Sequence, residues 1–137
     1  MAYWLFKSEP SSWSWEEQVA AGEAGTNWNG VRNHQAKLNL QAMRRGDRGF
    51  FYHSGEGKAI VGVVEVVREY YPDPSDETGR FGMVDVRAVE ALPEPVTLDR
   101  IKAEPRLKDM ALVRLPRLSV QPVTDEEWRI VRAMAGR

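Results

Sequence analysis

Short apolar runs separated by polar turns divide the first half of the chain into predicted strands. The aromatic and aliphatic residues 3–6 predict a buried strand, which ends at Ser8-Glu9-Pro10. Residues 49–53 and 59–67 are rich in aromatic and β-branched side chains, which favour strands. Because the connection between these two segments contains Gly55 and Gly57, they predict a hairpin.

The second half has a weaker strand pattern that prolines interrupt. Apolar and polar side chains partly alternate over residues 83–91, which predicts another strand. Pro93 and Pro95 are expected to end it, because proline cannot donate a ladder hydrogen bond. Residues 112–123 predict one or two further strands, broken at Pro116.

Capping residues mark the starts of helices. Ser14 and Thr124 each stand three residues before a glutamate, which is the spacing of a capping box. Asn33 starts a helix whose apolar residues recur at helical spacing. The helix that begins after Thr124 carries Trp128 on its apolar side.

Strands and helices are therefore interspersed along the 137 residues, a length typical of one domain. Most neighbouring strands are joined by connections too short for crossover helices, which favours antiparallel pairing. The expected architecture is an α+β fold: a small, curved, mostly antiparallel sheet or barrel with peripheral helices, in a single domain over residues 1–137.

Composition narrows the classes of function. The chain has no cysteine, which excludes disulfides, thiol nucleophiles and zinc sites of the cysteine type. No stretch approaches the roughly 18 consecutive apolar residues that span a bilayer, and the N-terminus lacks the basic region of a secretory signal. We therefore expect a cytoplasmic protein with no membrane partner.

Charge is balanced in sum but uneven along the chain. The net charge of −1 argues against a protein that coats nucleic acid through bulk electrostatics. Residues 32–48 nevertheless carry five basic side chains against one acid, and residues 100–117 carry six against two. These segments predict either a positive face that attracts a phosphate backbone or two ordinary solvated surfaces.

The sequence contains no recognisable catalytic or metal-ligating constellation. His34 and His53 have no acid or second histidine at metal-ligand spacing. His53 and Ser54 are neighbours on a predicted strand, so their side chains point to opposite faces and cannot share a proton. Gly55-Glu56-Gly57-Lys58 lacks the spacing of a phosphate loop and is better explained as a hairpin turn. We expect no enzyme activity, no metal and no cofactor.

Tryptophan is concentrated at the start of the chain. Four of the five tryptophans lie within the first 28 residues, which indicates either core packing or a pocket for a flat ligand. Trp28 stands in a polar loop between Asn27 and Asn29, which is less typical of a core residue and makes it the candidate ligand face. The other four tryptophans are assigned to packing: Trp4, Trp13, Trp15 and Trp128.

Four blocks of sequence are distinctive when they are read in order. They are Tyr3-Trp4-Leu5-Phe6-Lys7-Ser8-Glu9-Pro10; Trp28-Asn29-Gly30-Val31-Arg32-Asn33-His34-Gln35-Ala36; Gly46-Asp47 with Phe50-Phe51-Tyr52-His53-Ser54; and Arg117-Leu118-Ser119-Val120-Gln121-Pro122-Val123. Together these blocks resemble the EVE domain family, and segments 69–73 and 83–86 also look like family segments. The resemblance covers essentially the whole chain.

This resemblance implies both a fold and a function. The implied fold is PUA-like, a curved pseudo-barrel with peripheral helices, related to the YTH modules that read methylated adenine in RNA. The implied function is nucleic-acid binding, in which an aromatic pocket reads a modified base in DNA or RNA. Resemblance and residue chemistry together mark twelve candidate binding residues: Lys7, Ser8, Glu9, Trp28, Val31, Arg32, Asn33, Tyr52, His53, Ser54, Arg117 and Ser119.

A pocket for a modified base needs aromatic faces, because the ligand is a flat ring with a polar edge. Trp28 is expected to stack on the base, and Tyr52 either forms a second wall or packs in the core. The outer wall departs from the family pattern, because the loop over residues 73–82 is short and Phe81 stands where many members look to have tryptophan.

Polar residues near the same blocks are candidates for the base edge and the phosphate. Ser8 and Asn33 can donate and accept along a base edge, or serve as caps of turns and helices. Glu9 can accept from an exocyclic amino group. Arg117 is expected to hold phosphate, and Arg32 either does the same or pairs with an acid of the fold.

Two other functions fit the same features. The aromatic pocket could serve a small-molecule sensor or a nucleoside-processing enzyme, and exposed aromatic side chains could serve an adaptor that contacts protein. If the protein reads a base, we expect it to prefer an unpaired or flipped nucleotide, because extraction from a duplex costs a few kcal/mol.

Overall fold

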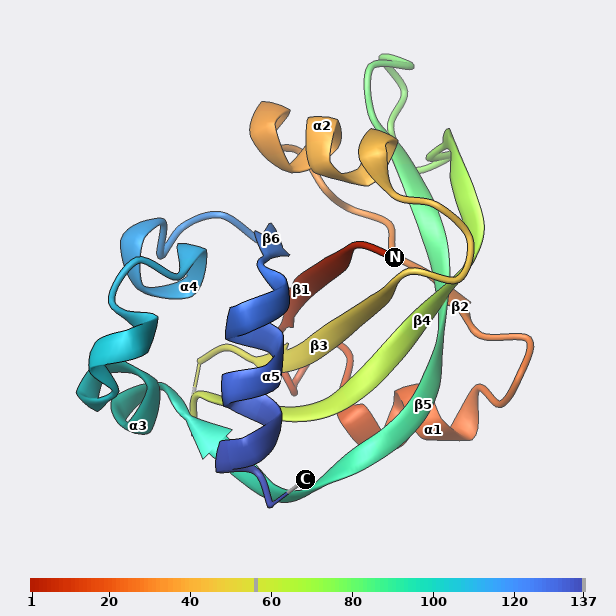
Figure 1. The fold of residues 1–137 in the computed structure, drawn as a ribbon. Coiled ribbons are helices and arrows are strands. Elements are labelled where there is room, and N and C mark those ends of the chain that lie inside the picture. Colours follow the sequence, from red (N-terminus) through yellow and green to blue (C-terminus); the bar gives the residue numbers. More distant parts are fainter. Residues whose placement is uncertain (56, 137) are drawn as a thin grey trace.

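A six-stranded sheet forms the centre of the computed structural model, which describes residues 1–55 and 57–136 (Figure 1). Its strands are β1 (Tyr3–Ser8), β2 (Thr26–Asn27), β3 (Arg48–His53), β4 (Ala59–Pro72), β5 (Gly82–Thr97) and β6 (Val120–Val123). Their order across the sheet is β2-β5-β4-β3-β1-β6. Pairing is antiparallel except between β1 and β3, so the expected mostly antiparallel α+β arrangement is confirmed with one parallel pair.

Helices cover both faces of this sheet. They are α1 (Trp15–Ala20), α2 (His34–Ala42), α3 (Leu98–Ala103), α4 (Ala111–Arg114) and α5 (Asp125–Met134), with a 3₁₀ turn at Pro105–Leu107. In Figure 1, α5 crosses the sheet on the near side, and α2 lies along its upper edge. The capping boxes predicted at Ser14 and Thr124 and the cap at Asn33 are all confirmed.

The strands divide their side chains between two hydrophobic clusters. Phe50 of β3 belongs to the cluster beneath α5, which we call the sealed face, together with Trp128. Phe51, its neighbour on β3, belongs to the cluster beneath α1 and α2, which we call the open face, together with Trp28. This division follows from the alternation of side chains along a strand.

The predicted hairpin is confirmed, and the Trp15 ring packs against Gly62 of its second strand. β3 and β4 pair from Arg48 opposite Glu65 to His53 opposite Ala59. A Cβ on Gly62 would lie 2.4 Å from the Trp15 ring, so only glycine lets that ring approach the strand. Glu56, within the predicted hairpin turn, lies outside the described residues.

One strand prediction is wrong and another is only partly confirmed. β5 continues past Pro93 and Pro95, because both prolines are exposed and fall where the register with β4 shifts, so no ladder donor is lost there. Of the one or two strands predicted over residues 112–123, one forms, β6 at the end, while α4 takes the start where the other was expected. Leu112 is buried by a helical turn, and a short apolar run alone does not distinguish such a turn from a strand.

The described residues include neither a membrane-spanning helix nor a cluster of metal ligands. No helix among residues 1–55 and 57–136 is long and apolar enough to cross a membrane. The same residues contain no group of three or more histidine, aspartate or glutamate side chains placed to hold a metal ion.

Candidate functional site

A cavity of about 460 Å³ lies where the end of β1 meets the segment before α2. Its size is within the range of small-ligand sites. The lining combines two tryptophans with hydroxyl, amide and charged side chains: Lys7, Ser8, Glu9, Ser12, Trp13, Thr26, Asn27, Trp28 and Asn29. Four of the twelve predicted binding residues therefore meet here, namely Lys7, Ser8, Glu9 and Trp28.

Trp28 is both a core residue and part of the cavity wall. Only 8% of it is exposed, and its ring packs edge-on against Phe6, at 5.3 Å between centroids, and Phe51, at 5.7 Å. Its backbone N–H donates to the carbonyl of Val84 at 2.8 Å. These contacts hold the ring rigidly, so a ligand in the cavity meets an ordered aromatic wall.

Trp13 is the second tryptophan that lines the cavity, although its sequence context had been interpreted as packing. Its indole N–H donates to Gln18 Oε1 at 2.9 Å, and the Ser8 hydroxyl donates to its backbone carbonyl at 2.6 Å. The ring is half-buried. The sequence did contain a signal, because Trp13 lies among Ser11, Ser12 and Ser14, a polar context like that of Trp28.

Polar side chains stand at the rim of the cavity. Asn27 and Asn29 flank Trp28 and are both exposed, so their amides can donate to and accept from a ligand edge. Glu9 is also exposed, while its backbone carbonyl accepts from the N–H groups of Ser12 and Trp13 at 2.9 Å each. The rim therefore offers both donors and acceptors around an aromatic interior.

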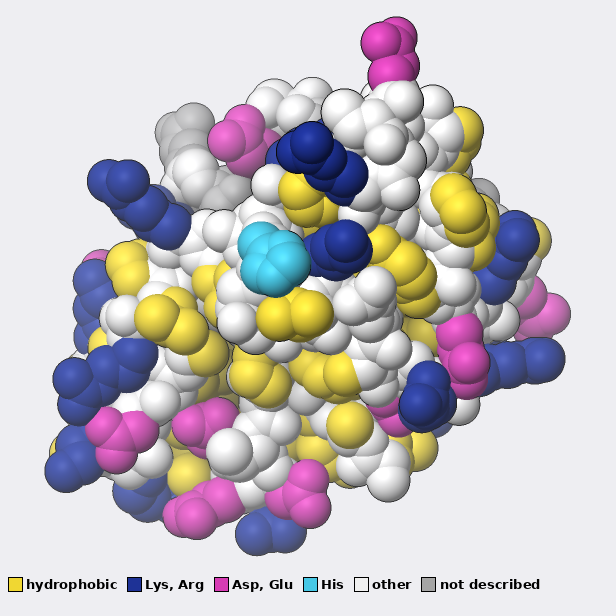
Figure 2. All heavy atoms as spheres, turned by 90° about the horizontal axis from the view of Figure 1, so that it is seen from above, with side chains coloured by type: hydrophobic (Ala, Val, Ile, Leu, Met, Phe, Trp, Pro, Cys, Tyr) yellow, Lys and Arg dark blue, Asp and Glu magenta, His cyan; other side chains and the backbone are white. Residues whose placement is uncertain are grey.

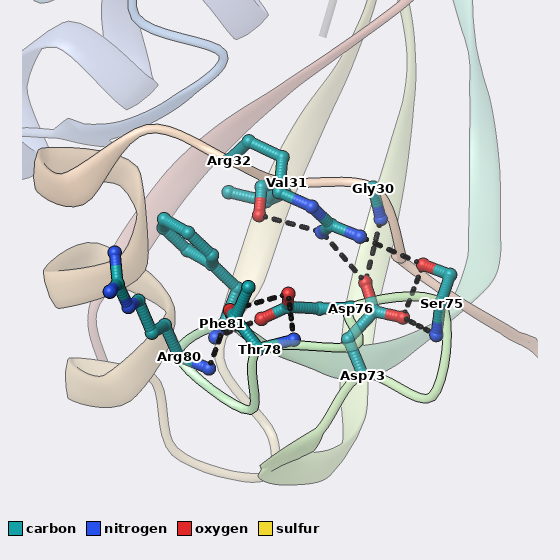
Figure 3. Close-up of polar contacts among 9 residues, drawn as sticks. All are labelled: Gly30, Val31, Arg32, Asp73, Ser75, Asp76, Thr78, Arg80 and Phe81. Atoms are coloured by element: carbon teal, nitrogen blue, oxygen red, sulfur yellow. Dashed lines mark hydrogen bonds and ion pairs between the residues drawn. The ribbon is translucent and has the colours of Figure 1, made fainter.

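A buried aspartate fixes the loop that follows Trp28 (Figure 3). Asp73 accepts from the backbone N–H of Gly30 at 2.9 Å, from Arg32 Nη1 at 3.2 Å, and from the N–H and hydroxyl of Ser75 at 2.8 and 2.6 Å. Burial alone would raise the pKa of Asp73, but the hydrogen bonds from Ser75, Gly30 and Arg32 outweigh it and lower the pKa to about 2. Gly30 has φ of +80°, which suits glycine.

This network shows one of the two roles expected of Arg32, the pairing with an acid of the fold. The guanidinium pairs with Asp73 and also donates to the carbonyl of Val31 at 3.1 Å and to Ser75 Oγ at 3.1 Å. Arg32 thus pairs with an acid of the fold and orders the loop. Val31 itself is buried in the open-face cluster.

Phe81 lies beside this network, at the outer edge of α2. The guanidinium carbon of Arg32 is 5.7 Å from its ring centroid, and Lys37 Nζ is 5.8 Å from it. Its backbone N–H donates to Asp76 Oδ2 at 2.7 Å. Phe81 does not line the cavity, so it packs beneath cations instead of forming the outer wall of that cavity.

Lys7 connects β1 to the segment that precedes β6. Its backbone N–H donates to the carbonyl of Ser119 at 2.9 Å, and Nζ donates to the carbonyl of Pro116 at 2.6 Å. Burial, followed by the nearby charge of Lys58, lowers the pKa of the Lys7 amine. Ser119 therefore contributes a backbone carbonyl at this junction and is not a cavity residue.

Tyr52 lies outside the cavity. It is 3% exposed and belongs to the sealed-face cluster with Phe50, so core packing, the alternative given above, is confirmed. Burial raises the pKa of its phenol. The second aromatic residue of the cavity is Trp13 instead.

His53 and Ser54 support the walls without lining the cavity. His53 Nε2 accepts from the backbone N–H of Trp15 at 3.1 Å, which ties α1 to the end of β3. Burial lowers the pKa of His53, and the charge of Glu16 partly opposes this. The Ser54 N–H donates to the carbonyl of Ser8 at 2.9 Å, which fixes the end of β1.

Asn33 and Arg117 meet in a separate hollow. The Asn33 side chain caps α2 by accepting from the N–H of Ala36 at 2.9 Å, which confirms its capping role. Arg117 is exposed and lines a groove of about 370 Å³ together with Asn33 and Gln35. This groove is distinct from the cavity that Trp28 lines.

Both basic segments are partly neutralised by the fold. Arg44 Nη1 lies 4.0 Å from Glu69 Oε1, and Arg106 Nη2 lies 2.8 Å from Glu104 Oε1. Three other basic residues also form ion pairs: Arg32, Arg100 and Arg114. Seen from above, basic side chains nevertheless stand over and around α2, with hydrophobic side chains between them (Figure 2). The segments are therefore neither a uniform positive face nor fully neutral.

Comparison of the chain with known proteins defines its class. The architecture is a PUA-like α+β fold, and a YTH domain from Zygosaccharomyces rouxii shares it with a TM-score of 0.59 at 18% identity, over 99% of this chain and 85% of that one. The sequence model of the EVE domain matches residues 2–134. The chain belongs to the EVE domain family.

The chain is similar to several members in detail. Thymocyte nuclear protein 1 of Rattus norvegicus is 36% identical over 96% of this chain and 73% of its own length. The solution structure of Rpa0253 from Rhodopseudomonas palustris has a TM-score of 0.94 at 63% identity, covering 99% of this chain and 94% of that one. Human thymocyte nuclear protein 1, solved in complex with DNA that contains 5-methylcytosine, has a TM-score of 0.92 at 33% identity. The match covers 100% of this chain and 99% of that one.

Proposed function

We propose that this protein binds nucleic acid and reads a modified base in the cavity lined by Trp13 and Trp28. The observation that carries the proposal is the pairing of these two tryptophans with exposed amides and a carboxylate at one small cavity. Stacking on an aromatic side chain contributes about 1–3 kcal/mol per base. The amides of Asn27 and Asn29 are placed to recognise the edge of the ring.

The relationship to human thymocyte nuclear protein 1 supports the same function. That protein was solved with DNA containing 5-methylcytosine, and its fold matches this chain from end to end. An added methyl group is apolar, so it is bound more favourably by an aromatic wall than by water. We therefore take 5-methylcytosine in DNA as the first probe for this chain.

We infer binding without chemistry. The cavity lining contains one carboxylate, that of Glu9, and one amine, that of Lys7, whose Nζ already donates to Pro116. No hydrogen-bonded pair of base and nucleophile lines it among the described residues. Incubation with free 5-methylcytosine nucleoside is expected to leave that nucleoside unchanged.

The test is a fluorescence-anisotropy titration of the full chain with matched oligodeoxynucleotides. One oligonucleotide carries a single central 5-methylcytosine and the other carries cytosine, each as a single strand and as a duplex. We expect tighter binding of the methylated strand. The single strand is expected to bind better than the duplex, because a paired base must first be flipped out. Equal affinity for the methylated and unmethylated strands would contradict the proposal.

Matched aromatic substitutions locate the site. Trp13 and Tyr70 are both partly buried and pack against the open-face cluster, but only Trp13 lines the cavity. Trp13→Ala is expected to weaken binding by about 1–3 kcal/mol. Tyr70→Ala is expected to leave the affinity of the folded protein unchanged. If both variants bind like the parent protein, the base does not enter this cavity.

A further inference from the structure

A second hollow lies between the start of α2 and the segment that follows α4. Its lining includes Leu115, Pro116 and Leu118, which we call the apolar floor, together with Asn33 and Gln35 from the start of α2. Leu115 is 51% exposed, which is unusual for a large aliphatic side chain of this protein. Leu115 and Pro116 are exposed, whereas Leu118 is only 7% exposed and belongs to the open-face cluster. None of these three residues lines the base cavity.

The groove and the base cavity share two stretches of chain. On one side, Trp28 and Asn29 line the cavity, and a few residues later Asn33 and Gln35 line the groove. Since an extended chain advances at most about 3.6 Å per residue, Asn29 and Asn33 are no more than roughly 14 Å apart. A nucleic-acid strand covers such a distance in a few nucleotides.

The other shared stretch is held together by Lys7. Its Nζ donates to the carbonyl of Pro116, which belongs to the groove, while Lys7, Ser8 and Glu9 line the cavity. The Lys7 N–H also donates to Ser119 just beyond the groove. The walls of the two hollows are therefore fixed to one another by hydrogen bonds.

The charge of the groove selects an anionic occupant. Its lining residues, all of them in the described part of the chain, include Arg114 and Arg117 but no acid. Arg114 is paired with Asp109 at 2.9 Å, whereas Arg117 makes no ion pair or hydrogen bond among the described residues. A free guanidinium beside an apolar floor suits a phosphate next to a flat ring.

We infer that the groove holds the nucleotide next to the base that the cavity reads, in the same strand; this inference rests on the proposed function. The phosphate of that nucleotide pairs with Arg117, and its base lies on Leu115 and Pro116. Asn33 and Gln35 also line the groove. Asn33 Oδ1 accepts from the Ala36 N–H and Gln35 Nε2 donates to Asn39 Oδ1, which leaves the Asn33 amide nitrogen and the Gln35 amide oxygen for the base. A neutral peptide or a lipid would gain no affinity from the connection between the base cavity and the groove.

A length series tests whether the groove is used. The full chain is titrated with single-stranded oligodeoxynucleotides that carry one 5-methylcytosine and a flank that grows from no nucleotides to several, first on the 5′ side and then on the 3′ side. We expect affinity to rise stepwise as the flank on one side reaches the groove. The flank on the other side is expected to contribute less. An equal, gradual gain on both sides would overturn the inference.

Two variants with matched controls assign that gain to the groove. Arg117→Ala is expected to weaken binding of the long oligonucleotide roughly three- to tenfold and to reduce the salt dependence of log K by about one unit. Arg129→Ala removes an equally exposed arginine from α5 and is expected to change neither. Leu115→Glu places a carboxylate on the floor and is expected to weaken binding similarly, whereas Val19→Glu, at a residue 50% exposed on α1, is not.

The outcomes separate this inference from the proposed function. If Trp13→Ala abolishes recognition of the methylated base while Arg117→Ala and Leu115→Glu behave like their controls, the base cavity stands and the groove is not used. If the parent protein does not distinguish methylated from unmethylated strands at any length, the proposed function fails. Loss of the flank-dependent gain in Arg117→Ala, with methyl discrimination on the shortest oligonucleotide retained, supports the inference.

Discussion

Trp128 and Trp28 pack against neighbouring phenylalanines of β3, yet they lie in opposite surroundings. Trp128 is stacked between Phe50, at 4.0 Å between centroids, and Tyr3, at 4.2 Å, and α5 closes that face. Trp28 meets Phe51 edge-on at 5.7 Å and also lines a cavity. The two rings have similar exposure, 4% and 8%.

The difference comes from what covers each face. The sealed face is closed by α5, whose Trp128, Ile130 and Val131 are buried. The open face is covered by two helices, α1 of six residues and α2 of nine, and the segments around them leave a cavity lined by polar side chains. Aromatic content and burial therefore do not distinguish a sealed tryptophan from one that lines a cavity. The convergence of polar groups at a gap in the covering layer does.

Truncation of the sealed tryptophan should have the largest effect on stability. Trp128→Ala removes a buried ring from two stacking partners and is expected to lower the free energy of unfolding by about 3–5 kcal/mol. Urea denaturation followed by circular dichroism measures this. At temperatures where the variant remains folded, its affinity for the methylated strand should match that of the parent protein. A selective loss of affinity in the folded variant would break the distinction between the two faces.

Removal of the Asp73 charge should affect both stability and binding. Asp73→Asn weakens the charged hydrogen bonds to Gly30 and Arg32, which is expected to lower the free energy of unfolding by about 2–3 kcal/mol. It should also weaken oligonucleotide binding, because the loop that follows Trp28 loses its anchor. The control is Glu77→Gln, which changes an exposed carboxylate in the loop between β4 and β5 that also contains Asp73. It should change neither stability nor binding.

Acid titration provides an independent check on Asp73. Because its folded pKa of about 2 lies below the ordinary value of 3.8, the carboxylate stabilises the fold fully above pH about 4. This contribution is lost as the pH falls through about 2. The difference in unfolding free energy between the parent protein and Asp73→Asn should therefore shrink over that interval. A difference that stays constant would show that the charge is not what stabilises the loop.

The smallest expected effect is a pH dependence at His53. Burial lowers its pKa below 6.5, so the folded protein favours the neutral ring, whose Nε2 accepts from the Trp15 N–H. Its contribution to stability is present above pH about 6.5 and is lost as the pH falls through the lower folded pKa. The parent protein should lose more stability between neutral pH and pH about 5 than His53→Gln does. Identical pH profiles would contradict this role.

Much of the fold followed from local sequence rules. The capping boxes at Ser14 and Thr124 and the hairpin of β3 and β4 could be predicted, because each depends on contacts within a few residues. The continuation of β5 past Pro93 and Pro95 could not be predicted from local sequence. It depends on the register shift against β4, which is a property of the paired strand and not of β5 alone.

The site could be predicted only in part. Trp28 and the end of β1 were predicted for the site and line the cavity, whereas Trp13 was assigned to packing and Tyr52 was considered for a second wall. Alternation along β3 shows that Tyr52 shares a face with Phe50 and not with Phe51. Which of those faces stays open depends on the length and placement of α1 and α5, and this is decided by tertiary packing.

The most direct test follows the five tryptophan side-chain N–H signals in a ¹⁵N-correlated NMR spectrum while a 5-methylcytosine strand is added. Trp13 and Trp28 line the cavity, whereas Trp128 is sealed and the indole N–H of Trp4 donates to Asp47 at 3.1 Å. We predict large shifts for Trp13 and Trp28, smaller ones for Trp15, and none for Trp4 and Trp128. Saturable binding that leaves the Trp13 and Trp28 signals in place would contradict the assignment of the open face as the base-reading site.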